Sequence, residues 1–224
     1  MLSIIIPLYN EELMLLKMSA YLHGLSRSAE LIFADGGSTD HSVDIARRYG
    51  KVFCVEKGRA LQMNYGAIRA HNDILLFLHA DTVISAATLK SIEKEIISEG
   101  YSGGCLTQKI DHKAHVYRLI EWQGNIRARM TREFYGDQGI FVKKETFLKI
   151  GGFPEVPIME DVLFTHKLRS HGKTVVLPDT IMVSARRWEK KGVIQTVLLF
   201  SRIIVLFWFR TPLNKIKQLY EDIR

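Results

Sequence analysis

The sequence lacks the features of a secreted, repetitive or disulfide-bonded protein. Only two of its 224 residues are cysteines, Cys54 and Cys105, and no C-x-x-C pair is present. Cysteines this sparse and this far apart indicate reduced packing residues in a cytoplasmic protein. We expect no secretory signal, because the first apolar stretch is short and has no basic flank. Internal repeats, low-complexity segments and clear linkers are also missing.

Two common nucleotide-binding signatures and a broadly basic surface are missing as well. Neither the G-x-G-x-x-G pattern nor the Walker A pattern occurs, which excludes the usual dinucleotide-binding and P-loop folds. The net charge is +7, but residues 184–224 alone carry +6, so the first 183 residues are nearly neutral. Because nucleic-acid-binding faces are broadly basic, we expect no nucleic acid partner for the main part of the chain.

What is present is an alternation of short apolar runs with helical patterns. Predicted strands and helices alternate along the first part of the chain at residues 2–8, 11–25, 30–35, 40–49, 51–57, 60–71 and 73–81. Strands separated by helices predict βαβ units, and therefore an α/β fold with a mainly parallel sheet flanked by helices. Beyond residue 101 we expect helices at 112–130 and 159–172, a strand after residue 135, and two last strands at 173–178 and 180–188.

Polar and small residues collect at the ends of these strands. The four predicted strand ends read PLYNE at 7–11, DGGSTD at 35–40, KGR at 57–59 and HAD at 79–81. The carboxyl ends of neighbouring parallel strands lie at one edge of the sheet, where such folds bind their ligands. A single acid at a strand end is usually a helix cap. Four strand ends with the same character favour a nucleotide-binding crevice.

Each of these side chains has a structural interpretation beside the functional one. Asp35 could accept hydrogen bonds from a nucleobase, Tyr9 could pack on that base, and Glu11 could accept from a ribose hydroxyl. Glu11 is also a favourable acid in the first turn of a helix. We interpret Asp40 as the N-cap of the second helix. Arg59 opens a helix and suits a diphosphate, although a solvated surface arginine fits the local sequence equally well.

Five motifs in a fixed order resemble the inverting family 2 glycosyltransferases, which have the GT-A fold. They are PLYNEE, DGGSTD, the strand that ends in an acid near residue 80, GGF and MED, and the similarity runs over residues 2–188. The segments GRALQMNYGA, FLHADT, YGDQGIFV, MEDV and SARRWEKKG look closer to a small single-domain bacterial subgroup. The resemblance implies a Rossmann-like GT-A domain at residues 1–190. Its reaction would move a sugar, with inversion, from a UDP- or GDP-sugar donor to an acceptor hydroxyl.

The resemblance also implies a set of donor-binding residues. That set is Pro7, Tyr9, Glu11, Asp35, Arg59, Asp137, Gln138, Arg187 and Trp188. Asp137 and Gln138 would line the sugar or acceptor pocket, although a tight turn explains Gly-Asp equally well. Arg187-Trp188 is similar to the Q-x-x-R-W signature of processive relatives, and would bind the diphosphate and stack on a sugar. Ser184 stands where that signature has Gln, which argues against processive polymer synthesis.

Four further residues would carry the chemistry. Asp81 matches the last acid of the family's D-x-D signature, which implies that it binds Mn²⁺ or Mg²⁺ beside the donor diphosphate. His79 stands where the family more often has Asp, and either joins the metal or packs near the donor. Glu160-Asp161 matches the family's E-D pair, which implies that Asp161 is the base and Glu160 its support. Taken locally, the pair is also two acids at a helix N-terminus, where the helix dipole favours them.

A different class of function remains open beside the transferase. The chain could be a non-catalytic nucleotide-sugar-binding protein that acts as a membrane-associated partner or regulator. The presence of both Asp81 and Asp161 argues against this alternative, because a binding module has no need of a base.

Residues 191–224 form an apolar and then basic helical tail. Residues 192–209 are the most apolar stretch, but they are shorter than a spanning helix and contain Arg202 near their middle. Such a helix either lies on an anionic membrane surface or packs on the domain or a second subunit as a homodimer contact. On the membrane alternative, the protein is peripheral on the inner face of the membrane and its acceptor is lipid-linked.

Overall fold

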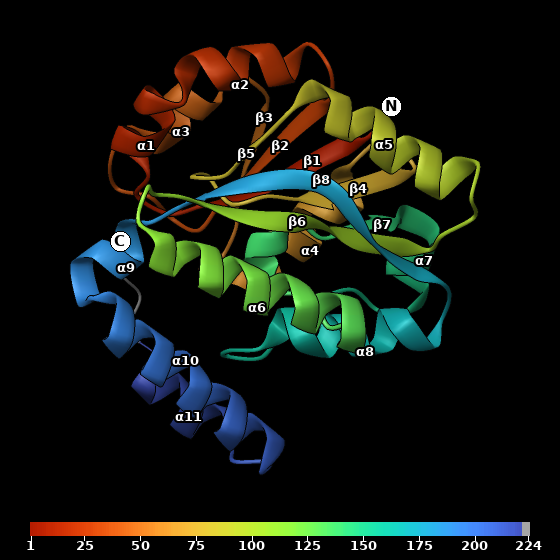
Figure 1. The fold of residues 1–224 in the computed structure, drawn as a ribbon. Coiled ribbons are helices and arrows are strands. Elements are labelled where there is room, and N and C mark those ends of the chain that lie inside the picture. Colours follow the sequence, from red (N-terminus) through yellow and green to blue (C-terminus); the bar gives the residue numbers. More distant parts are fainter. Residues whose placement is uncertain (221–224) are drawn as a thin grey trace.

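The computed structural model describes residues 1–220, so that residues 221–224 of the predicted tail lie outside the described part (Figure 1). The strands are β1 (Ser3–Leu8), β2 (Glu30–Asp35), β3 (Lys51–Cys54), β4 (Ile74–Phe77), β5 (Val83–Ile84), β6 (Gly103–Asp111), β7 (Phe141–Lys143) and β8 (Thr174–Ser184). In the described residues they form one sheet with the order β3-β2-β1-β4-β7-β6-β8-β5.

Helices cover both faces of this sheet. They are α1 (Glu12–Lys17), α2 (Ser19–Ser26), α3 (Ser42–Ala46), α4 (Arg59–Arg69), α5 (Ala86–Ile97), α6 (His115–Thr131), α7 (Lys144–Lys149), α8 (Glu160–Ser170), α9 (Arg186–Lys191), α10 (Val193–Trp208) and α11 (Leu213–Leu219), with a 3-10 helix η1 (Gly136–Gln138). One apolar core lies between the sheet and α1, α2, α3 and α5, and a second lies between the sheet and α4, α7 and α8 (Figure 1). The long helix α6 contributes to both cores, through Tyr117 and Ala128.

The first half of the chain forms the parallel part of the sheet, as predicted. β1 pairs in parallel with β2 and β4, and β2 pairs in parallel with β3. These strands are continuous apolar runs because helices cover both of their faces. Two predicted strands end earlier than expected, at Cys54 and Phe77, and the predicted helix 11–25 is divided into α1 and α2 at Met18. The early end of β4 leaves His79 and Asp81 in the following loop.

The second half is mixed and was predicted less well. β7 pairs antiparallel with β4 and β6, whereas β6 and β8 are parallel, so that four of the seven pairings within residues 1–220 are parallel. The prediction of two last strands was wrong, because 173–178 and 180–184 form the single strand β8. Pro178 lies opposite a register shift between Cys105 and Thr107, where a missing N–H is tolerated. Residues 186–188 belong to α9 rather than to a strand.

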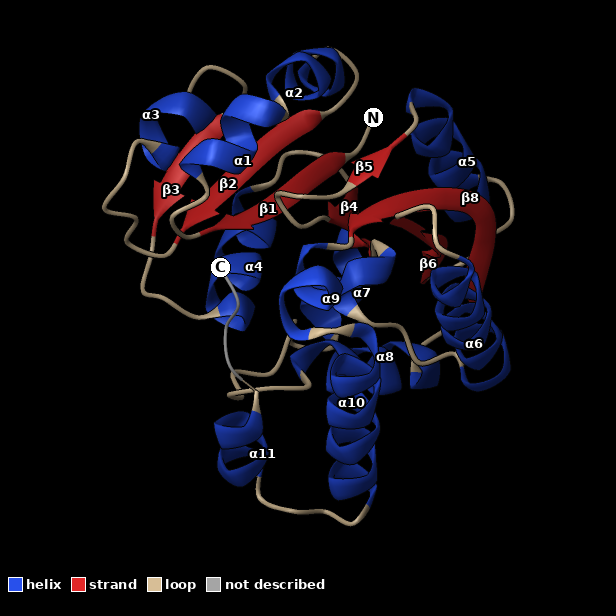
Figure 2. Cartoon of the chain, turned by 60° about the vertical axis from the view of Figure 1, so that its left-hand side comes forward, coloured by secondary structure: helices blue, strands red, loops and turns tan. Residues whose placement is uncertain are grey.

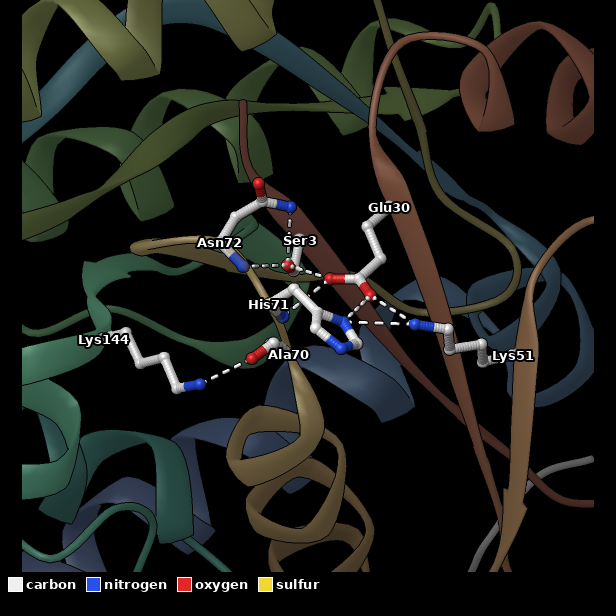
Figure 3. Close-up of polar contacts among 7 residues, drawn as sticks. All are labelled: Ser3, Glu30, Lys51, Ala70, His71, Asn72 and Lys144. Carbon is white, nitrogen blue, oxygen red and sulfur yellow. Dashed lines mark hydrogen bonds and ion pairs between the residues drawn. The ribbon is translucent and has the colours of Figure 1, made fainter.

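A polar cluster closes the amino edge of the sheet (Figure 3). The Glu30 carboxylate at the start of β2 accepts hydrogen bonds from Ser3 Oγ at 2.6 Å and from the backbone N–H of His71 at 2.9 Å. It also lies 2.6 Å from His71 Nδ1 and 3.1 Å from Lys51 Nζ. The cluster therefore joins the starts of β1, β2 and β3 to the segment that leads into β4.

The C-terminal helices extend below the sheet in both views (Figures 1 and 2). α10 and α11 lie side by side, and position 190, where we expected the domain to end, falls inside α9. Within residues 1–220 no helix combines the length and the apolar character needed to cross a membrane.

Candidate active site

The carboxyl ends of β1 and β2 are tied together by one buried amide. Gln62 on α4 donates from Nε2 to the carbonyl oxygens of Leu8 and Ala34, at 2.7 Å in both cases. Gly36 N donates to Leu8 O at 2.9 Å. These bonds satisfy carbonyls at the ends of two strands and place residues 7–11 beside residues 35–40. Sequence reasoning missed Gln62, because an isolated glutamine on a helix carries no signal.

Asp35 organises the loop that follows β2. Its Oδ2 accepts from the backbone N–H groups of Gly37 and Ser38, both at 2.9 Å, and its Oδ1 accepts from Ser38 Oγ. The side chain is buried. Two oxygens with two lone pairs each leave one acceptor position, on Oδ1, for a nucleobase donor. Asp40 was predicted to be the N-cap of the second helix, but the N-cap of α3 is His41, and Asp40, one residue earlier, accepts from Ser42 N.

Lys57 and Tyr9 form a platform beside this loop. The Lys57 ammonium lies 3.8 Å from the centroid of the Tyr9 ring, a cation–π contact that covers one ring face. The contact joins the segment after β1 to the segment after β3, as expected of neighbouring strand ends. Lys57 was not among the predicted site residues.

Arg186 connects two predicted site residues. Its Nη1 lies 3.9 Å from Glu11 Oε2, and its Nη2 lies 3.8 Å from Asp81 Oδ2. The first helical residue of α9 therefore reaches the ends of β1 and β4. Sequence reasoning assigned the diphosphate role to the next residue, Arg187. The rotation of α9, which no local pattern reveals, places Arg186 rather than Arg187 near Glu11 and Asp81.

A compact group of charged residues lies at the start of α8. Glu160 is buried, and its Oε1 lies 3.5 Å from Arg59 Nη1. Asp161 Oδ2 accepts from Gly136 N at 2.7 Å, and Oδ1 accepts from Val162 N at 2.8 Å. These two donors fix the direction of the Asp161 carboxylate.

His79 faces the same group. A Cβ built on Gly136 would lie 3.2 Å from His79 Nε2 and 3.5 Å from Asp161 Oδ2. A small cavity joins these parts, and the residues that line it are Pro7, Arg59, Met63, Phe77, Leu78, His79, Gly136, Ile140, Phe153, Glu160 and Asp161. The structure thus brings five predicted site residues together from β1, the loop after β4, α4 and α8.

The acids of this group are shifted toward the protonated form. Desolvation by burial raises the pKa of Glu160 and that of Asp161, and the two carboxylates repel each other. Arg59 acts in the opposite direction on both. Desolvation would lower the pKa of the Arg59 guanidinium, but the charges of Glu160 and Asp161 and the interaction with Tyr220 together outweigh it and raise that pKa. A raised carboxyl pKa is typical of a group that accepts a proton during a reaction.

The predicted pair Asp137–Gln138 divides into an exposed acid and a buried amide. Asp137 is exposed and accepts from Gln108 Nε2 at 2.6 Å. Gln138 is buried, and its Oε1 accepts from Tyr135 N and from Arg127 Nη2. Its Nε2 has no hydrogen-bond partner among the described residues. Neither residue lines the small cavity, so that their contact with a sugar stays a prediction.

Arg187 and Trp188 face the C-terminal helices. The Arg187 guanidinium lies 4.7 Å from the ring centroid of Tyr220 and 5.7 Å from that of Phe200. Trp188 makes edge contacts with Tyr117 at 6.4 Å and Phe200 at 5.6 Å. Both side chains pack against aromatic rings here, and the predicted roles in donor binding stay predictions.

The metal prediction rests on Asp81. In the described part of the chain, no group of three or more His, Cys, Asp or Glu side chains is arranged to bind a metal ion alone. The Asp81 side chain is 27% exposed at the sheet edge. Mg²⁺ commonly takes one or two carboxylates together with substrate phosphates. Asp81 therefore fits a metal shared with a diphosphate.

Comparisons with known proteins agree with this geometry. The model of a family described as "Glycosyl transferase family 2" matches residues 3–151. No curated protein sequence matches the chain. A crystal structure of S. aureus TarS 1-349 is similar, with a TM-score of 0.67 and 21% identity over 82% of this chain and 60% of that chain.

Two further solved structures have the same fold. Mannosyltransferase PcManGT from Pyrobaculum calidifontis, in complex with GDP-Man and Mn²⁺, has a TM-score of 0.64 and 20% identity, over 81% of this chain and 56% of that chain. Glucosyl-3-phosphoglycerate synthase from Mycobacterium tuberculosis, with Mn²⁺ and UDP, has a TM-score of 0.57 and 14% identity, over 80% and 70%. The chain spans less than two thirds of TarS 1-349 and of PcManGT. At these identities the likeness establishes the fold.

Proposed function

This chain belongs to glycosyl transferase family 2, and from that premise we propose that it transfers a sugar from a nucleotide-diphosphate donor to an acceptor hydroxyl. One observation carries the proposal. Asp161 and Glu160, both with raised pKa, line one cavity with Arg59 at the carboxyl edge of the sheet. This edge is where α/β sheets bind their ligands.

In the proposed reaction Asp161 is the base. The acceptor hydroxyl gives its proton to the Asp161 carboxylate while its oxygen forms a bond to the anomeric carbon of the sugar. The bond from that carbon to the diphosphate oxygen breaks, and the electron pair leaves with the diphosphate. A single displacement of this kind inverts the anomeric centre. The raised pKa makes Asp161 a stronger base than an exposed aspartate, and its two backbone donors keep it aimed.

Arg59 and Glu160 support the reaction by charge. Arg59 is the nearest cation to the acid pair, since its guanidinium is paired with Glu160. A positive charge held there in advance stabilises negative charge that develops on the leaving diphosphate. Glu160 orients Arg59 and keeps it from neutralising Asp161 directly.

A divalent cation, Mn²⁺ or Mg²⁺, would be bound by Asp81 together with the donor phosphates. When bound, it supplies charge stabilisation for the leaving diphosphate. Arg186 pairs with Asp81 and with Glu11, so its guanidinium lies beside the same position. His79 lines the same cavity as Asp161, which favours a role beside the sugar. The complexes of PcManGT and of the mycobacterial synthase with Mn²⁺ support a metal in this fold.

The nucleoside of the donor would lie across the ends of β1 and β2. Tyr9, whose ring Lys57 contacts, would pack on the base, and Asp35 keeps one acceptor position for it. Glu11, at the first turn of α1, is placed for a ribose hydroxyl. These features suit UDP- and GDP-sugars alike.

A donor panel tests the proposal. The wild type and the variant Asp161→Asn are mixed with UDP-, GDP- and dTDP-sugars, with and without Mn²⁺ or Mg²⁺. Nucleotide binding is measured by thermal shift, turnover by release of the nucleoside diphosphate, and inversion by the anomeric NMR signals of the product. We expect metal-dependent binding by both proteins and turnover by the wild type alone. Asp44→Asn, an exposed acid on α3, is the matched control and should retain turnover.

Each outcome of the panel has a distinct meaning. Equal turnover by the wild type and Asp161→Asn removes Asp161 as the base. Metal-dependent binding without turnover in either protein, for every donor and acceptor, supports the alternative of a non-catalytic sugar-nucleotide-binding protein. Absence of nucleotide binding contradicts the transferase proposal.

We also propose that α10 attaches the protein to an anionic membrane surface, which would make the acceptor lipid-linked. Its outward face carries four large exposed apolar side chains, Ile194, Leu198, Val205 and Trp208, which are four, seven and three residues apart, and exposed Phe209 follows at the end of the helix. Exposed Arg202, Arg210 and Lys215 flank this face. An apolar stripe between basic residues is typical of helices that lie in the lipid interface.

Vesicle binding tests the membrane contact. The full chain should sediment with vesicles that contain phosphatidylglycerol and remain free with neutral vesicles, and Trp208→Glu with Phe209→Glu should abolish the binding. Ile97→Glu, which changes an exposed apolar residue on α5, is the control and should bind normally. A chain that stays free of anionic vesicles, but forms a dimer that the double variant dissociates, would show a subunit contact instead.

A further inference from the structure

The C-terminal helices close against the segment that carries the acid pair. Ile158, two residues before Glu160, forms a buried cluster with Ile203 of α10 and Ile216 of α11. The side chains that pack against this cluster are Met159, Leu199, Phe200, Leu206, Phe207, Leu213 and Tyr220. The inner faces of α10 and α11 therefore hold the entry to α8, while the exposed stripe of α10 faces outward.

The segment that leads into α8 contains a residue with an unfavourable backbone conformation. Met159 has a φ of +67°, in the left-handed region, and it immediately precedes Glu160 and Asp161. A residue with a side chain adopts this conformation only where its surroundings impose it, at a cost of about 1–2 kcal/mol. The apolar cluster with Ile203 and Ile216 supplies that constraint. The direction in which α8 presents its first two residues thus depends on the tail.

Tyr220, at the end of α11, reaches the site itself. Its side chain packs against the cluster of Ile158, Ile203 and Ile216 and interacts with the guanidinium of Arg59, which is paired with Glu160. The Tyr220 ring is contacted by two more cations, since Arg187 lies 4.7 Å and Lys217 Nζ lies 5.3 Å from its centroid. A residue about sixty positions beyond Asp161 is therefore in contact with the partner of the acid pair.

We propose that α10 and α11 form a wall of the active site, in which Tyr220 is a positioning residue that holds the Arg59 guanidinium in place against Glu160. This inference rests on the transferase function proposed above. A neutral hydroxyl suits the task, because it fixes the direction of a guanidinium without cancelling its charge. The full positive charge of Arg59 then remains for the leaving diphosphate. Glu160 alone would leave Arg59 free to rotate about the ion pair, and charge stabilisation depends on groups fixed in advance.

A double-mutant cycle on the full chain tests the role of Tyr220. Tyr220→Phe removes the hydroxyl and keeps the ring, and we expect kcat to fall about tenfold, with KM for the donor changed less than about twofold. In an Arg59→Lys background the same change should lower kcat less than about twofold, because the partner is already altered. Tyr101→Phe, just before β6 at the other edge of the sheet, is the matched control and should leave kcat unchanged.

A second measurement does not depend on turnover. Amide hydrogen exchange in the first turn of α8, where Leu163 N donates to Met159 O, reports how firmly the tail holds this segment. We expect Tyr220→Ala, which also removes the ring, to speed exchange there about tenfold, and Tyr101→Phe to have no effect.

The two measurements separate the possible failures. Equal loss of kcat in both backgrounds would show that Tyr220 does not act through Arg59, and unchanged kcat in Tyr220→Phe would contradict the positioning role. Unchanged amide exchange in Tyr220→Ala would contradict the proposal that α10 and α11 form a wall of the active site. A wild type without turnover refutes the proposed function instead, and the exchange experiment then decides alone whether the tail holds α8.

Discussion

Two groups of carboxylates at opposite edges of the sheet behave in opposite ways. Glu30, at the amino edge, is surrounded by donors from Ser3, His71 and Lys51 (Figure 3). Glu160 and Asp161, at the carboxyl edge, share a cavity with the Arg59 guanidinium. Both groups belong to the same domain, and both lie where a loop meets a strand or helix.

Their pKa values show the consequence. Desolvation alone would raise the pKa of Glu30, but the hydrogen bonds from Ser3 and His71 and the contact with Lys51 outweigh it and lower that pKa to about 2. Desolvation raises the pKa of Glu160 and Asp161, and their few donors do not compensate. A carboxylate that stays charged serves to join strands, whereas one that readily takes a proton can serve as a base. The donors around each acid and the extent of its burial together set the direction of the pKa shift.

The largest difference between the two groups of carboxylates should be in the effect of their substitution on kcat. Asp161→Asn removes the base, and general base catalysis contributes about 10²–10⁴-fold, so kcat should fall by about that factor. Glu30→Gln should leave kcat within about twofold of the wild type, because its cluster lies at the far edge of the sheet. Steady-state release of nucleoside diphosphate measures both. If kcat falls as much in Glu30→Gln as in Asp161→Asn, the two groups of carboxylates do not differ in their importance for turnover.

The free energy of unfolding should depend more on Glu30 than on Asp161. Glu30→Gln leaves Ser3 Oγ, a backbone N–H, the Lys51 ammonium and the His71 ring without their carboxylate, and should lower the free energy of unfolding at pH 7 by about 1–2 kcal/mol. For a chain of this size we expect Tm to fall by about 3–6 °C in a calorimetric scan. The difference should persist above pH 4.5 and disappear as the pH falls through about 2, because a lowered pKa stabilises only while Glu30 is ionised. An unchanged Tm at pH 7 would show that the cluster contributes nothing.

Asp161→Asn should have a small effect of the opposite sign on stability. Folding raises the pKa of this carboxyl, so its charged form opposes folding at pH values above the raised pKa. The variant should therefore melt about 2 °C higher than the wild type at pH 7. The difference should vanish below pH 3.8, the ordinary value, where the wild-type group is protonated in both the folded and the unfolded chain. A lower Tm at pH 7 would mean that the carboxylate stabilises the fold, as Glu30 does.

Substitution of Arg186 should have the smallest effect of these changes, and the effect should be on metal-dependent donor binding. Its guanidinium is half exposed and lies near Asp81 and Glu11, where it competes for the charge that a metal would use. Exposed pairs contribute about 0.2–1 kcal/mol, so Arg186→Gln should lower the Mn²⁺ concentration needed for half-maximal donor binding by about two- to threefold. Titration of Mn²⁺ in the thermal-shift assay measures it. A need for more Mn²⁺ would show that Arg186 assists metal-dependent binding.

The carboxyl edge was predictable because its signals are local. Continuous apolar runs predicted β1, β2, β3 and β4, and the polar residues that follow them predicted the edge at which Pro7, Arg59 and His79 now meet. The carboxyl ends of neighbouring parallel strands lie at the same edge of a sheet, so these residues come together independently of the second half of the chain. The family match to residues 3–151 confirms the resemblance that the motifs suggested.

The second half was predicted less well because its elements depend on distant partners. α5 and β6 were not predicted, and β8 was divided in two at Pro178, since only its pairing with β6 shows that a bulge absorbs the proline. Arg186 was passed over in favour of Arg187 for the same reason. Which of two adjacent arginines reaches Asp81 depends on the rotation of α9, and adjacent residues on a helix point about 100° apart.

The sequence by itself determined the parallel half of the sheet, the edge that carries the polar residues and the family, because buried strands and strand-end motifs are written in consecutive residues. Only the tertiary structure decided which carboxyl groups have a lowered pKa and which have a raised one. Glu30 and Glu160 are the same residue type in the sequence. The groups that contact their carboxylates come from segments that lie far away in the chain. The tertiary structure also gave the tail an inner face that holds α8 and Arg59 and an outer face that stays exposed, because burial depends on what a helix packs against and not on its composition.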